Sequence, residues 1–173
     1  GHRGELRRGD PDYPAAILAN ACLGQSTLTS RLGLAVRDGA GLTYGIYSRF
    51  FGTLRLAGPW AISLSVAGEN LDRALALSRT VVADYAAGGP TEAELADERL
   101  AQAGAYRVAL ATNGGVAREL VAALTAGEPV AALDRYPERL LAVTRDEVVG
   151  AIRRHLHPEQ LVMTVAGTLP PAP

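Results

Sequence analysis

Apolar residues recur at helical spacing through the first forty positions of the chain. One stripe lies between Asp10, a candidate N-cap that a proline follows, and Gly24, which is expected to end the helix. A second stripe lies between Ser26 and a pair of glycines that can close a helix, Gly39 and Gly41. The stripes consist of Ile17, Leu18, Ala21 and Cys22, and of Leu28, Leu32, Ala35 and Val36.

Strict alternation of apolar and polar residues replaces the helical spacing from Thr43 to Leu56. It places Tyr44 on the same face as Ile46. A turn is predicted at residues 57–59, Ala-Gly-Pro, and apolar alternation then resumes from Trp60 to Val66. This region is therefore expected to form a β-hairpin with one buried side.

Helical spacing returns through most of the second half of the chain. Two capping boxes of the form Thr-x-x-Glu begin at Thr91 and Thr144, and Asn70 and Asn113 are candidate caps. An apolar, β-branched run over residues 161–166 predicts a buried last strand, and a proline-rich tail follows at residues 170–173. Helices are expected over residues 71–87, 91–111, 113–127, 130–141 and 144–155.

This order of elements predicts an α+β fold, in which helices cover one face of an antiparallel or mixed sheet as a second layer. A length of 173 residues fits one domain spanning residues 1–173. Three strands make a thin sheet, so we expect the domain to lack its first strand.

Composition narrows the classes of partner. The net charge is −1 and the 17 basic residues, all arginine, are scattered, which argues against nucleic acid as a partner. No apolar run is long enough to span a membrane, and the chain does not open like a signal peptide. The compartment stays open, with the cytoplasm slightly favoured over the periplasm.

Few residues could carry chemistry by themselves. The histidines, His2, His155 and His157, lack the spacing that places two zinc ligands on one helical face. Cys22 lies on an apolar stripe without a basic neighbour in sequence, which is typical of a core residue. The glycines after Asn113 could bind an anion, but helix capping explains them more simply. No metal site and no complete catalytic site are predicted.

Arg37 and Tyr44 stand seven residues apart across the predicted helix-to-strand turn. Both donate hydrogen bonds and one carries charge, so together they could hold a peptide carbonyl or stabilise an oxyanion. An arginine near a helix C-terminus and a tyrosine in a strand are also common for structural reasons alone. On spacing alone the structural interpretation is favoured.

The motifs around this turn occur in a recognisable order. They are Asp10-Pro11-Asp12-Tyr13, Asn20, Leu23-Gly24, Ser30-Arg31-Leu32, Val36-Arg37-Asp38, Gly41-Leu42-Thr43-Tyr44-Gly45-Ile46-Tyr47-Ser48, Gly89-Pro90-Thr91-Glu92-Ala93-Glu94-Leu95 and Ala142-Val143-Thr144-Arg145-Asp146-Glu147-Val148. Over nearly its whole length the chain resembles the second, non-zinc domain of the M16 (pitrilysin-like) zinc metallopeptidases. It departs from them at Gly24-Gln25-Ser26, where a glycine pair is common.

The resemblance implies a two-domain or two-subunit enzyme with a cleft. The opposing domain would hold zinc through an inverted His-x-x-Glu-His motif and a further glutamate, and nothing in this chain matches those ligands. This domain would contribute an arginine and a tyrosine that contact the substrate backbone and the tetrahedral intermediate. Those positions match Arg37 and Tyr44, which are therefore the expected accessory catalytic and substrate-binding residues.

The resulting hypothesis is the substrate-binding, non-zinc half of an M16-type metalloendopeptidase or oligopeptidase, inactive by itself. Its expected partners are a zinc-bearing domain or subunit, in cis or in trans, and a peptide substrate, and the isolated domain could self-associate. Two alternatives remain open, a scaffold or assembly subunit that has lost the protease chemistry and a module that binds extended peptides at a sheet edge.

Overall fold

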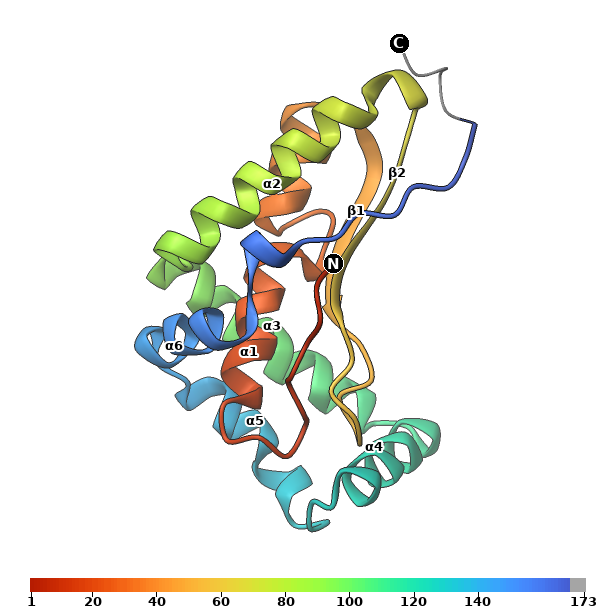
Figure 1. The fold of residues 1–173 in the computed structure, drawn as a ribbon. Coiled ribbons are helices and arrows are strands. Elements are labelled where there is room, and N and C mark those ends of the chain that lie inside the picture. Colours follow the sequence, from red (N-terminus) through yellow and green to blue (C-terminus); the bar gives the residue numbers. More distant parts are fainter. Residues whose placement is uncertain (169–173) are drawn as a thin grey trace.

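The computed structural model describes residues 1–168 as a two-stranded antiparallel sheet packed against a group of helices (Figure 1). This arrangement confirms the expected α+β fold. The α-helices are α1 (Tyr13–Asn20), α2 (Leu71–Gly88), α3 (Glu92–Ala109), α4 (Asn113–Ala126), α5 (Ala132–Ala142) and α6 (Arg145–His155). The strands are β1 (Thr43–Phe50) and β2 (Trp60–Val66), and the short helices are η1 (Ala21–Gln25), η2 (Gly33–Gly39), η3 (Gly68–Asn70) and η4 (Pro158–Gln160).

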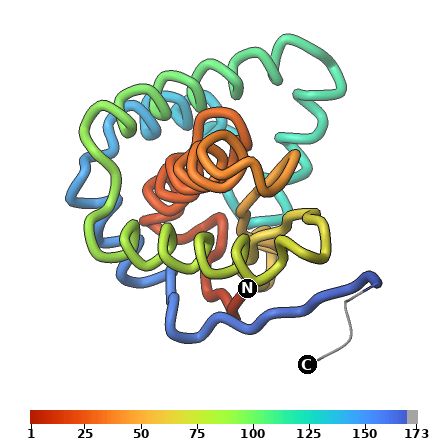
Figure 2. Tube along the Cα trace, turned by 90° about the horizontal axis from the view of Figure 1, so that it is seen from above, coloured from red at the N-terminus to blue at the C-terminus, as the bar shows by residue number. Residues whose placement is uncertain are grey.

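Helix α1 forms the centre of the molecule, and the other helices surround it (Figure 2). It is short and apolar, and Leu18 is fully buried in it. Ile46 and Trp60 bring the inner face of the sheet onto this core, and Tyr85 of α2 donates a hydrogen bond from its hydroxyl to the carbonyl of Ala19. The core therefore fixes β1 and β2 relative to the first helix.

Local capping signals placed most helix ends well. Both predicted capping boxes form, at Thr91 and at Thr144. Two predicted caps are wrong by one or two residues. Helix α1 is preceded by Asp12 instead of Asp10, because Asp10 closes a turn in which it accepts a hydrogen bond from the Arg7 amide. Helix α4 is capped by Thr112, whereas Asn113 is its first residue.

The hairpin forms as predicted, but β1 ends at Phe50, earlier than Leu56. Beyond Phe50 the chain turns at Gly52, whose φ of 64° is in the left-handed region. The prediction that Tyr44 shares the inward face of Ile46 is wrong. The register shifts between Thr43 and Ile46, and Tyr44 is 93% exposed.

Residues 161–166 are the other correction, because they form no strand. A strand needs a row of backbone partners, and the only backbone bonds that this segment makes to another segment in the described structure join Val162 to Gly1. Val162 is also 72% exposed instead of buried. The proline-rich run at residues 170–173 lies outside the described residues.

Candidate functional site

The turn that carries Arg37 and Tyr44 is closed by its own backbone. Helix η2 is a π-helix, a wide turn that recurs at functional sites. After it, the amides of Gly41 and Leu42 donate to the carbonyls of Arg37 and Val36, both at 3.0 Å. Gly41 adopts a φ of 64°, which favours glycine. Because these bonds satisfy the helix end, the turn delivers the chain into β1 with a fixed geometry.

The structure brings Arg37 and Tyr44 together. The Nε atom of Arg37 donates to the backbone carbonyl of Tyr44 at 3.0 Å, and the guanidinium carbon lies 5.9 Å from the centre of the tyrosine ring. The Nη1 atom of Arg37 also pairs with an Asp38 carboxylate oxygen at 2.5 Å. Arg37 is thus oriented from two sides, with its side chain 29% exposed. The phenol of Tyr44 extends from the protein beside it.

Arg31 fixes the start of this helical segment. It forms a two-pronged ion pair with Glu94 of α3, with both N–O distances at 2.7 Å, and its guanidinium carbon lies 5.0 Å from the centre of the Tyr85 ring. Glu94 also closes the capping box with Thr91. The hydrogen bonds from Arg31 are the main cause of a Glu94 pKa lowered to about 2. Sequence reasoning assigned no role to this pair, because its members lie 63 residues apart.

Asn20 is a second structural residue whose role the sequence did not reveal. Its side-chain amide donates to the Ser48 carbonyl at 3.0 Å, and its oxygen accepts from the Ser48 hydroxyl and the Trp60 indole, both at 2.9 Å. All three residues are buried. Asn20 therefore joins the end of α1 to both strands, and so holds the hairpin that begins near Tyr44.

Cys22 is buried, in agreement with the expectation of a core residue. Burial is the largest cause that raises the pKa of its thiol, to about 12. The thiol is therefore protonated at neutral pH, and a nucleophilic role is not supported.

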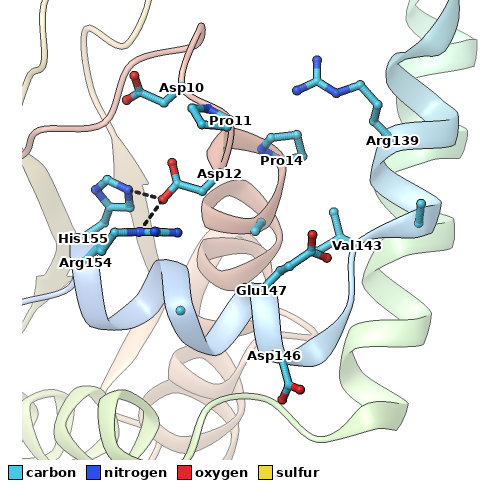
Figure 3. A pocket seen from close by; sticks show the side chains of 13 residues that line it. Asp10, Pro11, Asp12, Pro14, Arg139, Val143, Asp146, Glu147, Arg154 and His155 are labelled. Carbon is cyan, nitrogen blue, oxygen red and sulfur yellow. Dashed lines mark hydrogen bonds and ion pairs between the residues drawn. The ribbon is translucent and has the colours of Figure 1, made fainter.

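The C-terminal histidines make ordinary local pairs. His155 Nε2 lies 2.8 Å from an oxygen of Asp12, and Arg154 Nε lies 2.9 Å from the same oxygen (Figure 3). His157 lies 3.6 Å from Glu159. Within residues 1–168 no group of three His, Cys, Asp or Glu side chains could hold a metal ion. The described part of the chain therefore does not fit zinc.

Two other features carry no site. The pocket of about 820 Å³ beside Asp12 is bounded by α1, α5 and α6, and Arg37 and Tyr44 do not line it (Figure 3). The glycines at the start of α4 serve packing and capping, since the Gly115 amide donates to the Thr112 hydroxyl at 3.0 Å. Along the described residues, no helix combines the length and the apolar character needed to cross a membrane.

The class of protein follows from comparison with known families. The family described as "Peptidase M16 inactive domain" matches residues 3–101, more than half of the chain and the part that contains Arg37 and Tyr44. The chain belongs to this family, as its motifs indicated. A comparison with curated proteins gave no match.

Solved structures agree with this assignment. The M16 inactive domain from Pseudomonas fluorescens is 32% identical, with a TM-score of 0.83 over 91% of this chain and 37% of that one. A proposed zinc protease from Bordetella pertussis Tohama I is 20% identical, with a TM-score of 0.75 over 91% of this chain and 85% of that one. The periplasmic protease PqqL from Escherichia coli is 20% identical, with a TM-score of 0.72 over 90% of this chain and 17% of that one.

The identities limit what these structures say. Those at 20% share the fold alone, so the periplasmic location of PqqL does not transfer and the compartment stays a prediction. The chain spans little more than a third of the length of the first two structures that it matches, 37% and 36%.

Proposed function

We propose that this chain is the substrate-binding, non-zinc half of an M16-type zinc metalloendopeptidase or oligopeptidase. Zinc is held by another domain or subunit, in cis or in trans, and the substrate is a peptide. The observation that carries the proposal is the pairing of Arg37 with an exposed Tyr44 on a turn whose backbone is fully closed. The membership of the chain in the M16 inactive-domain family supports the same assignment.

The pair is suited to binding a peptide backbone and the charge that develops on it. A phenol and a guanidinium are both hydrogen-bond donors, and Arg37 is permanently charged. Arg37 spends its Nε on the Tyr44 carbonyl, which fixes where the tyrosine enters the strand. The exposed Tyr44 phenol then donates to a carbonyl or oxyanion presented from across the cleft. Loss of one such donor typically costs about 3 kcal/mol of transition-state stabilisation.

The test is turnover by the enzyme reconstituted with its zinc-bearing partner. Tyr44→Phe removes only the hydroxyl, so we expect kcat/KM to fall by about 100-fold while the zinc content of the complex is unchanged. Tyr47→Phe is the matched control, because Tyr47 lies three residues further along β1 and is 47% exposed. Equal kcat/KM for the two variants would remove Tyr44 from the mechanism. A wild-type complex that cleaves no peptide would instead favour the scaffold hypothesis.

A further inference from the structure

A groove runs along the free edge of β2, between that strand and residues 161–168. Its floor is α2, and it contains two cavities of about 110 and 270 Å³. Their walls are mainly apolar, with Ile62 and Leu64 on one side, Leu75 below and Met163 opposite. We call this feature the edge groove. The Arg37–Tyr44 turn is on the other strand, so the proposed function does not use the groove.

The first two residues of the chain already lie as a strand at one end of the edge groove (Figure 1). The His2 amide donates to the Trp60 carbonyl at 2.9 Å, and the Trp60 amide donates to the His2 carbonyl at 3.1 Å. On the other side, Gly1 and Val162 exchange the same two bonds at 2.9 and 2.8 Å. Both exchanges are antiparallel pairs, so β2 and residues 161–168 run parallel to each other with room for one strand between them.

Backbone alternation turns the polar groups of β2 toward this space. Trp60 directs its amide and carbonyl to His2, so the equivalent groups of Ile62, Leu64 and Val66 face the edge groove. An unpaired strand edge of this kind is a template for a further strand. The side chains of the same three residues are half-buried toward α2 and form one wall of the two cavities.

We propose that the edge groove is the seat of an extended strand that is joined to Gly1 and runs antiparallel to both walls. Continuity favours this occupant, because Gly1 already occupies the strand position at the end of the groove. The pairing of His2 with Trp60 sets the register. The first, third and fifth residues before Gly1 lie opposite Ile62, Leu64 and Val66, and their side chains enter the cavities. Those three positions are apolar, and residues 161–166 become the outer strand of a four-stranded sheet.

Three N-terminal extensions of the 173-residue chain test the proposal. Val-Thr-Val-Thr-Val before Gly1 places valine at the three inward positions. Thr-Val-Thr-Val-Thr shifts the pattern by one residue, and Gly-Ser-Gly-Ser-Gly supplies length alone. We expect the first extension to slow hydrogen exchange at the Leu64 and Val66 amides by at least about tenfold and to raise Tm by about 5 °C. The other two leave both quantities near those of the unextended chain.

Equal effects of the first two extensions would overturn the register, and no protection with any of them would overturn the strand seat. The unextended chain mixed with the acetylated peptide Val-Thr-Val-Thr-Val identifies the source of the strand. Protection by the free peptide equal to that of the joined one would show that the groove takes a strand from another chain, and would overturn the joined occupant. These readouts need no zinc-bearing partner, so they stand or fall apart from the proposed function.

Discussion

Replacing Asn20 by alanine removes a hydrogen-bond junction at the centre of the fold. The side chain is 7% exposed and takes part in three hydrogen bonds, which join α1 to the Ser48 carbonyl, the Ser48 hydroxyl and the Trp60 indole. Alanine preserves the helix, since it has the highest helix propensity. The measured effect therefore reports the junction and not the secondary structure around it.

The expected loss of stability is about 4 kcal/mol. Each of the three hydrogen bonds contributes about 1 kcal/mol net. The Trp60 N–H is then left buried without an acceptor, which costs about 1 kcal/mol more at the low end of the usual range. A domain of this size typically has about 5–15 kcal/mol of stability, so the variant loses a large part of it.

Urea denaturation followed by tryptophan emission measures this loss directly, because Trp60 is the only tryptophan of the chain and belongs to the junction. Asn113→Ala is the control, since Asn113 is exposed in the first turn of α4 and should change stability by less than about 0.5 kcal/mol. A loss below about 1 kcal/mol for Asn20→Ala would refute the additive reasoning. In the double variant with Ser48→Ala, the second substitution should cost less than it does alone, because the two side chains share a bond.

Two further predictions concern a carboxylate and a glycine. The Glu94 pKa of about 2 is below its unfolded value, so the contribution of this carboxylate is present above about pH 4.5 and is lost as pH falls toward 2. Glu94→Gln should therefore lose less urea stability between pH 7 and pH 3 than the wild type, and parallel profiles would contradict this. Gly115→Ala should destabilise by more than about 2 kcal/mol, because its Cβ would lie 1.6 Å from the Ala109 carbonyl oxygen. Gly114→Ala meets nothing within 4 Å and should stabilise by about 0.5 kcal/mol; thermal melts that rank the two variants equally would exclude this explanation.

The sequence predicted the features that depend on neighbouring residues. The capping boxes at Thr91 and Thr144 and the hairpin between Thr43 and Val66 are local patterns, and all three form. Helix α5 forms around Pro137 as its apolar spacing indicated. Each of these signals needs only a few adjacent residues to be satisfied.

Features that depend on distant residues were missed or misplaced. Asp10 and Asp12 are equally good caps by type, but the carboxylate of Asp12 is occupied by Arg154 and His155, more than 140 residues away. The side chain therefore makes no capping bond, although Asp12 precedes α1. No local pattern contains this information, because it arises only when α6 packs on α1.

The exposure of Tyr44 shows how a departure from a regular pattern can mark a candidate site. Regular alternation would have placed the ring inside with Ile46, where it could contribute to packing. The irregular register after Thr43 turns it outward, and the Thr43 hydroxyl stabilises the irregularity by donating to the Ser65 carbonyl at 2.7 Å. Exposing a tyrosine in a strand forgoes the stabilisation that burial would give. A ring kept 93% exposed beside a doubly oriented Arg37 is better explained by binding than by folding.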